Sequence, residues 1–157
     1  QLATHGMHHH GFDPQRTERG SDMTYELAED LPKVLLHFEA INGILRNLVG
    51  NARKYAAVSF EPNPDGSAPE PILIRTRLYG DKVLLEVADR GPGVPEVEQA
   101  KIFKAFYRMG NEGTRETPGT GLGLHLVVLH AQALNAQVSY RARKGGGSVF
   151  TVAFKPV

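Results

Sequence analysis

Four stretches of the sequence alternate apolar with other side chains, and they fall into two pairs. Residues 72–79 and 82–89 are separated only by Gly-Asp, and residues 137–143 and 148–154 only by Lys-Gly-Gly-Gly. A period of two is typical of strands, and connections this short predict antiparallel hairpins. A sheet built from these hairpins has an apolar face, which needs a second layer to cover it.

Two longer stretches predict that second layer. Residues 39–57 repeat apolar side chains at helical spacing, and residues 119–135 open with alternating glycines and continue as a helix. The apolar residues of the first helix fall within a sector of ~140°; they are Ile41, Ile44, Leu45, Leu48, Val49, Ala52 and Ala56. The expected buried stripe of the second helix is Leu122, Leu126, Leu129 and Ala133.

Two shorter strands at the start of the chain complete the pattern as edge elements. They cover residues 23–31 and 34–36 and are separated by Pro32. Residues 58–71 are dense in turn formers and predict a loop. Because strands outnumber helices, and the helices stand between hairpins, the sequence predicts an α+β fold. We expect a two-layer sandwich in which helices cover one face of a mixed, mostly antiparallel sheet.

Asp89 ends a row of aliphatic residues that face the predicted core. Val83, Leu85, Val87 and Asp89 share one face of their strand by the period of two. A buried carboxylate without partners is costly, so Asp89 needs either N–H groups of the protein or a donating ligand. Two explanations stay open. The D-x-G turn could bring local amides to the carboxylate, or the amino group of an adenine could donate to it.

A polar stripe runs along the first predicted helix, beside its apolar face. Asn47, Asn51, Lys54 and Tyr55 line up there at ~100° per residue. The stripe is either a solvated flank of the helix or the rim of a binding site. Mg²⁺ prefers hard oxygen ligands, with water and phosphate in most positions, so the side-chain oxygen of Asn51 is a candidate for its lone protein ligand.

Residues 90–119 join the sheet to the second helix without a regular period. Three prolines interrupt them, and a short apolar-aromatic cluster lies within them: Ile102, Phe103, Phe106 and Tyr107. Loops of this length are usually functional lids or disordered, and the aromatic residues favour a lid that docks part of the time. The sequence G-T-G-L-G-L then opens the second helix, where glycines and a helix N-terminus offer backbone N–H groups to a phosphate.

Composition excludes several classes of function. The formal net charge is +1 with both signs interspersed, which indicates neither a nucleic-acid surface nor direct membrane contact. The absence of cysteine excludes disulfides and thiolate sites and fits a cytoplasmic location. No apolar run approaches the ~20 residues of a membrane span.

The first 20 residues differ from the rest of the chain. They contain four of the seven histidines and show no hydrophobic period. We expect residues 1–20 to be a flexible or artificially added tail, with a His-rich metal site as the alternative. Residues 21–157 then form one domain with one core.

Four blocks of sequence occur in an order and spacing that resemble a known family. They are N-L-V-G-N-A-R-K-Y (47–55), D-R-G-P-G (89–93), I-F-K-A-F-Y-R (102–108) and G-T-G-L-G-L (119–124). These resemble the N box, first glycine box, F box and second glycine box of the ATP-binding catalytic domain of bacterial sensor histidine kinases. The superfamily also includes gyrase, the Hsp90 chaperone and the MutL repair protein. The resemblance covers roughly residues 24–155 and implies the Bergerat fold with a long ATP lid.

The resemblance implies ATP and Mg²⁺ as cofactors and assigns roles to the polar stripe. Asn51 would ligate Mg²⁺, and Asn47 would contact a phosphate or the shell of the metal. Lys54 would reach a phosphate, and Tyr55 would pack on the adenine. Arg108 would contact the γ-phosphate from the lid, where its fork of donors could steady charge during transfer.

The glycine boxes and the F box receive roles in the same way. Asp89 would bind the adenine amino group, and Gly91 and Gly93 would shape the pocket. Phe103 and Phe106 would anchor the lid to the domain or to a partner. The second glycine box would close over the phosphates with Gly119, Thr120, Gly121, Leu122, Gly123 and Leu124.

The N box also bears on the type of reaction. Relatives that hydrolyse ATP carry a Glu four residues before the metal-binding Asn, and this Glu is the general base for water. Here Asn47 occupies that place, and an amide cannot accept a proton near pH 7, so transfer to another nucleophile is favoured over hydrolysis. The predicted function is therefore protein-histidine kinase activity, with Asn47 and Arg108 as its catalytic residues. An ATPase or an ATP-sensing interaction module of the same superfamily is the alternative.

The phosphoacceptor of the family is missing from the chain. None of the seven histidines is followed by Glu or Asp and then Leu-Arg-x-Pro-Leu. We therefore expect the acceptor histidine on a separate dimerisation domain of the same or a partner kinase, with a response regulator as an indirect partner. The stimulus, the cognate regulator, the oligomeric state and any membrane anchor of the parent protein are left open by this sequence.

Overall fold

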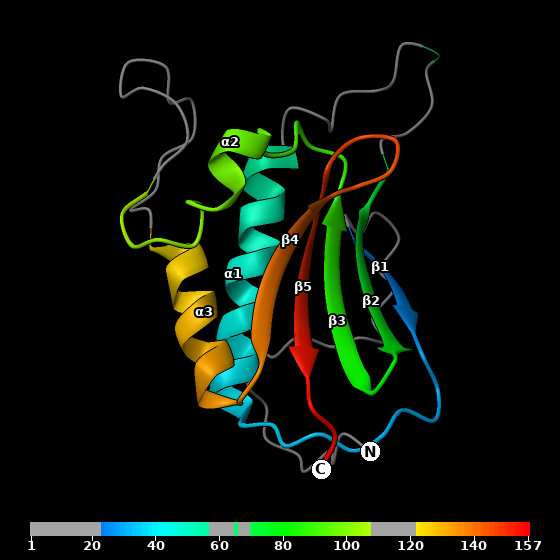
Figure 1. Cartoon of the computed structure of the whole chain (residues 1–157). Coiled ribbons are helices and arrows are strands. Elements are labelled where there is room, and N and C mark those ends of the chain that lie inside the picture. The colour runs from blue at the N-terminus through cyan, green and yellow to red at the C-terminus, as the bar shows by residue number, and fades with distance from the viewer. Residues whose placement is uncertain (1–22, 57–64, 66–69, 108–121) are drawn as a thin grey trace, which may run out of the picture.

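The structure is a computed structural model that describes residues 23–56, 65, 70–107 and 122–157 (Figure 1). Within these residues, five strands form one sheet in the order β1-β2-β3-β5-β4, and α1 and α3 pack side by side against one face of it. The elements are β1 (Met23–Leu27), α1 (Phe38–Ala56), β2 (Ile72–Tyr79), β3 (Lys82–Asp89), α2 (Glu96–Gln99), α3 (Gly123–Ala133), β4 (Gln137–Ala142) and β5 (Ser148–Phe154). This arrangement confirms the predicted two-layer α+β fold.

The sheet is mixed, as predicted. The hairpins β2–β3 and β4–β5 are antiparallel, and β3 is also antiparallel to β5. Only β1, at one edge among the described strands, runs parallel to its neighbour β2. The register between β3 and β5 places Asp89 opposite Ser148, so the ends of two hairpins that are distant in sequence meet at this point.

Several predicted boundaries were wrong. The first strand ends at Leu27 instead of residue 31, and residues 34–36 contribute only an isolated bridge between Val34 and Pro156. Asp30 has a φ of +56°, so the chain leaves the extended conformation before it reaches Pro32. The loop at 90–119 contains the short helix α2, and α3 begins at Gly123, after glycine-box residues that lie outside the described part.

Helix α1 carries the core face that its periodicity predicts. Ile44, Leu48 and Ala52 are almost completely buried against the sheet and α3. An acidic residue in the first turn and basic residues, Arg53 and Lys54, in the last turn complement the helix dipole. Because this face is fixed, the polar stripe beside it is held along the side of the helix.

The buried stripe of α3 was predicted wrongly. Leu126 and Leu129 are exposed by 38% and 45%, whereas Val127 and Ala131 are completely buried. The helix is apolar on most of its sides, so periodicity alone does not select a face. Contact with α1 selects it instead, and this contact is close: a Cβ on Gly43 would lie 2.5 Å from a ring nitrogen of His130.

The helix-free face of the sheet contains a buried ion cluster that the sequence analysis missed. Glu86, on the central strand β3, is 1% exposed and accepts hydrogen bonds from Arg75 (2.9 Å), Arg77 and Arg141 (3.0 Å). Burial raises the pKa of Glu86, but hydrogen bonds from Arg77 and Arg75, together with their charges, outweigh this effect and lower the pKa below 4.5. The carboxylate thus ties β2 and β4 to the middle of the sheet.

We expect Glu86→Gln to lower the free energy of unfolding by about 2 kcal/mol at neutral pH, because three charge-assisted hydrogen bonds are weakened. The folded-state pKa is below the unfolded one, so the stabilisation is present above pH 4.5 and is lost as pH falls through the folded pKa. Urea unfolding at neutral and acidic pH measures both effects. Glu70→Gln is the control, because Glu70 is 58% exposed and its ion pair with Arg90 should contribute less than about 1 kcal/mol. Equal losses in the two variants would contradict the assignment.

None of the helices in the described part of the chain combines the length and the apolar character that a membrane span requires.

Candidate nucleotide-binding site

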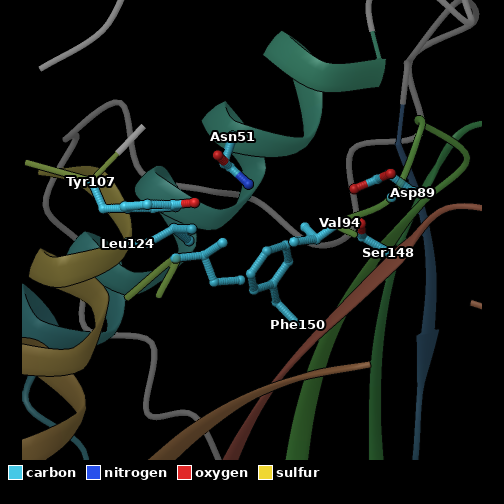
Figure 2. Close-up of a pocket in the computed structure, with 9 residues that line it drawn as sticks. Asn51, Asp89, Val94, Tyr107, Leu124, Ser148 and Phe150 are labelled. Atoms are coloured by element: carbon cyan, nitrogen blue, oxygen red, sulfur yellow. The ribbon is translucent and has the colours of Figure 1, made fainter. Parts of the chain in front are cut away.

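An open pocket lies where the C-terminal half of α1 meets the end of β3, the start of β5 and the start of α3 (Figure 2). Asp89 and Ser148 lie at one end of it, Tyr107 and Leu124 lie at the other, and Phe150 lies between them. Asn51 approaches from α1. The lining residues are Asn51, Asp89, Gly93, Val94, Ile102, Tyr107, Leu124, Ser148 and Phe150.

Asp89 is the buried acid of this pocket. It is the last residue of β3, and it is 4% exposed. Its Oδ1 atom accepts a hydrogen bond from the N–H of Gly91 at 2.8 Å, and the backbone of Ser148 also donates to the carboxylate. Burial raises the pKa of Asp89, whereas these two hydrogen bonds and the charge of Arg143 lower it, and burial has the larger effect. The local D-x-G contact is therefore present, and the carboxylate also lines the pocket.

Two glycines, Gly93 and Gly147, allow neighbouring backbone segments to pack closely around Asp89. Gly93 lines the pocket with φ at +73°, and a Cβ there would lie 3.3 Å from the carbonyl oxygen of Gly147. Gly147 itself has φ at +106°, and its Cβ would lie 2.0 Å from the carbonyl oxygen of Asp89. From the sequence, Gly147 was expected only to form part of the turn between the last two strands. The turn is packed directly on the strand that carries the acid.

The polar stripe of α1 splits into residues that reach the pocket and residues that do not. Asn51 lines it, but Asn47 and Lys54 are not among the lining residues. Asn47 lies one turn earlier, where its Nδ2 donates to the carbonyl of Gly43 at 2.8 Å and its Oδ1 lies 3.5 Å from the Cβ position of Gly123. Lys54 is exposed in the last turn of the helix.

The donor set of the pocket fits Mg²⁺ only together with a ligand. The side chain of Asn51 offers one hard oxygen, and no group of three or more His, Asp or Glu residues that could hold an ion occurs in the described ranges. Mg²⁺ keeps several waters and takes few protein ligands when substrate phosphates complete its shell. Asn51 therefore fits the role of a single protein ligand beside phosphates.

Comparison with known proteins identifies the family. A family model described as histidine kinase-, DNA gyrase B- and HSP90-like ATPase matches residues 38–157. The chain belongs to this family. The family model begins at the first residue of α1 and ends with the chain, so it includes every element that lines the pocket.

Curated proteins similar to the chain include sensor kinases. The chain is 30% identical over 139 residues to the alginate biosynthesis sensor protein KinB of Pseudomonas aeruginosa, covering 88% of this chain and 21% of KinB. It is 33% identical to the adaptive-response sensory kinase SasA of Synechocystis sp., covering 88% of this chain and 33% of SasA. The chain therefore spans a third or less of these two curated relatives.

Solved structures agree with this family. Full-length ShkA in complex with AMPPNP has a TM-score of 0.66 and 26% identity, covering 88% of this chain and 26% of ShkA. The catalytic domain of histidine kinase ThkA has a TM-score of 0.64 and 25% identity, covering 85% and 79% of the two chains. The chain thus corresponds to the nucleotide-binding catalytic domain of the sensor kinases, which confirms the resemblance drawn from the four boxes.

The described part of the F box, residues 102–107, forms one end of the pocket. Ile102 and Tyr107 line it, and the Tyr107 hydroxyl donates to Glu98 of α2 at 2.7 Å. The ring of Phe103 meets Phe150 edge-to-face at 6.2 Å, so Phe103 anchors the segment to β5. Phe106, which was expected to anchor the lid to the domain or to a partner, is 73% exposed and does not pack on the core. Its anchoring to a partner stays a prediction.

Several predicted site residues lie outside the described part of the structure. They are the side chain of Tyr55 and residues Arg108, Gly119, Thr120 and Gly121. The rest of the second glycine box is in place: Leu122 is the N-cap of α3, Gly123 begins the helix, and Leu124 lines the pocket.

Sequence reasoning missed five lining residues: Val94, Ile102, Tyr107, Ser148 and Phe150. Ser148 and Phe150 had a usable signal, because they begin the apolar face of β5. That face could be placed opposite Asp89 only once the β3–β5 register was known.

Proposed function

We propose that this chain is the ATP-binding catalytic domain of a two-component sensor histidine kinase, which transfers the γ-phosphoryl group of ATP to a histidine on a separate dimerisation domain. One observation carries the proposal: a buried carboxylate at the end of β3 and an amide of α1 line a single pocket beside the start of α3. The two polar groups suit the two ends of a nucleotide. The sensor kinases among the relatives support the same reaction.

The base end of the proposed site is at Asp89. The exocyclic amino group of adenine would donate to its carboxylate, which guanine cannot do with its carbonyl at the corresponding position. Val94, Ile102 and Phe150 supply apolar surface for the faces of the base. Asp89 is held in orientation by two backbone N–H groups, so little reorganisation is needed when the base enters.

The phosphate end lies toward α1 and α3. Asn51 would hold Mg²⁺, which when bound neutralises charge on the phosphates. Lys54 and Asn47 extend the same stripe and would contact the phosphates, as would the second glycine box from Gly119 to Leu124. Arg108 would reach the γ-phosphate from the lid. Tyr55, Gly91 and Gly93 complete the proposed nucleotide contacts.

The chemistry proposed is phosphoryl transfer in line with the leaving ADP. A ring nitrogen of the acceptor histidine forms a bond to the γ-phosphorus, and the bond from phosphorus to the β–γ bridging oxygen breaks. A neutral imidazole is already nucleophilic and needs no strong base, whereas water does. With an amide at Asn47 instead of a carboxylate, water is poorly activated. This favours transfer over hydrolysis.

The partners follow from the missing acceptor. A histidine-bearing helical dimerisation domain of the same or a partner kinase would supply the nucleophile, and a response regulator would later receive the phosphoryl group. We propose that the domain works in the cytoplasm, where ATP and response regulators are found.

The test is transfer from ATP labelled in the γ-phosphate. We expect the chain, mixed with a histidine-bearing dimerisation hairpin, to place label on the hairpin, and we expect acid to release that label as it does from phosphohistidine. The chain alone should not label itself. Release of the label mainly as inorganic phosphate would contradict transfer and would favour an ATPase.

Asn51→Ala is the variant that tests the metal role within the same assay. We expect transfer to fall at least about tenfold and to lose its dependence on Mg²⁺ concentration, because the lone protein ligand is removed. Asn42→Ala is the control, since Asn42 is an amide of the same helix that does not line the pocket. Unchanged Mg²⁺ dependence in Asn51→Ala would place the ion elsewhere.

A further inference from the structure

Tyr140 lies next to the pocket but is not one of its lining residues. It belongs to β4, where it pairs with Phe150 of β5. The two rings meet edge-to-face, with centroids 5.2 Å apart at 64°. Phe150 lines the pocket, so the ring of Tyr140 packs against a lining residue.

The hydroxyl of Tyr140 joins two further segments of the pocket. The backbone N–H of Val94 donates to it at 2.9 Å, and the Oγ of Ser148 donates to it at 3.2 Å. A Cβ built on Gly93 would lie 3.6 Å from the same oxygen. One atom of β4 thus contacts the segment after β3 and the start of β5, and both segments line the pocket.

The two residues that bond to the Tyr140 hydroxyl are both close to Asp89, one across the sheet and one along the chain. Ser148 pairs with Asp89 across the sheet and donates a backbone hydrogen bond to its carboxylate. Val94 follows Asp89 by five residues, and its carbonyl accepts a hydrogen bond from Gln99 at 3.0 Å. The peptide groups of Val94 are therefore held on one side by Tyr140 and on the other by α2. Displacement of Val94 would move an apolar contact of the proposed base.

We propose that Tyr140 is a positioning residue of the nucleotide site: its hydroxyl holds Val94 and Ser148 in place beside Asp89. The proposal rests on the ATP-binding function proposed above. Tyr140 does not line the pocket. It acts on affinity by holding two residues that do, because a pocket held in its binding geometry loses less free energy on binding than one that must be ordered.

Tyr140→Phe tests this role, because it removes the hydroxyl and keeps the ring that packs on Phe150. We expect the Kd of ATP and of ADP, measured by calorimetry well below the thermal midpoint, to rise about tenfold. In transfer to the hairpin, KM for ATP should rise by the same factor, with kcat within about twofold. Hydrogen exchange at the Val94 amide should accelerate in the nucleotide-free chain, since its acceptor is lost.

Two further variants separate positioning from general stability. Tyr79→Phe removes a hydroxyl from an exposed tyrosine of β2 and should change none of these quantities. Gln99→Met removes the hydrogen bond to the carbonyl of Val94, and it should weaken ATP and ADP binding in the same direction, by several-fold.

The outcomes are distinguishable. If the original chain binds ATP and Tyr140→Phe binds it equally well while exchange at Val94 accelerates, the hydroxyl has only a structural role and the inference is overturned. A tenfold loss in Tyr140→Phe with unchanged kcat supports it. If the original chain itself fails to bind ATP, the proposed function is wrong, and this inference fails with it.

Discussion

Asp89→Asn should weaken ATP binding about 100-fold while the domain remains folded. In the native site, backbone N–H groups of Gly91 and Ser148 donate to the carboxylate, which has acceptors to spare for a ligand. An asparagine has one oxygen and one NH₂ group, so its NH₂ must face either a backbone donor or the adenine amino group. A donor facing a donor in a buried site leaves both unsatisfied, and such a mismatch is worth about 1–3 kcal/mol or more.

Calorimetry with ATP and circular dichroism check the two parts of this prediction. Asp81→Asn is the matched control, because Asp81 lies in the exposed turn at the opposite end of the β2–β3 hairpin. It should leave the Kd of ATP unchanged. ATP affinity retained in Asp89→Asn would mean that the carboxylate serves only the local turn, which is the alternative that the D-x-G sequence left open.

The raised pKa of Asp89 gives a second consequence with a definite sign. Burial favours the protonated acid in the folded state. Protonation of Asp89 therefore stabilises the fold fully below the unfolded pKa, 3.8, and this stabilisation is lost as pH rises through the folded pKa. Binding behaves in the opposite way, because the ionised carboxylate is the better acceptor for adenine. ATP affinity should therefore fall as pH is lowered through the folded pKa. Titration of the ATP phosphates affects the original chain and the variant equally. The part of the pH dependence of ATP affinity that Asp89→Asn lacks is therefore due to Asp89.

Much of the fold could be predicted because it depends on local periodicity. The strand bounds of β2, β3 and β5 agree with the predicted ranges, since short turns fix where each strand begins and ends. The face of α1 was also predicted correctly. The face of α3 was not, because a helix that is apolar on most sides is oriented by its neighbour. Val127 and Ala131 are buried in the core, and the larger Leu126 and Leu129 remain outside.

The parts that could not be predicted depend on contacts between distant segments. Glu86 received no role from the sequence, because the arginines of β2 and β4 that bond to it are brought there by a register that is not readable from local sequence. The same reason applies in the site. Asn51, Asp89, Gly93 and Leu124 were identified from local motifs and line the pocket, whereas Ser148 reaches it only through the pairing of β5 with β3.

That pairing makes Gly147 the residue for which we expect the largest effect on the fold. Gly147→Ala should lower the free energy of unfolding by more than about 3 kcal/mol, combining the cost of a positive φ with a backbone collision. The added Cβ would lie 2.0 Å from the carbonyl oxygen of Asp89 and 2.9 Å from the Cα of Arg90. Both are backbone atoms that cannot rotate away. Relief requires β5 to separate from β3 where Ser148 meets Asp89, so ATP binding should be lost as well.

Gly146→Ala separates the two contributions, because Gly146 has nearly the same φ, +110°, but no atom within 4 Å of its Cβ position. It should cost only the backbone strain, about 1–2 kcal/mol, and should leave the Kd of ATP within a few-fold. Urea unfolding of both variants gives the difference, which is the part due to close approach. If the two alanines destabilise the chain equally, the turn does not press on β3. The acid would then keep its position by some means other than the contact between Gly147 and the strand end.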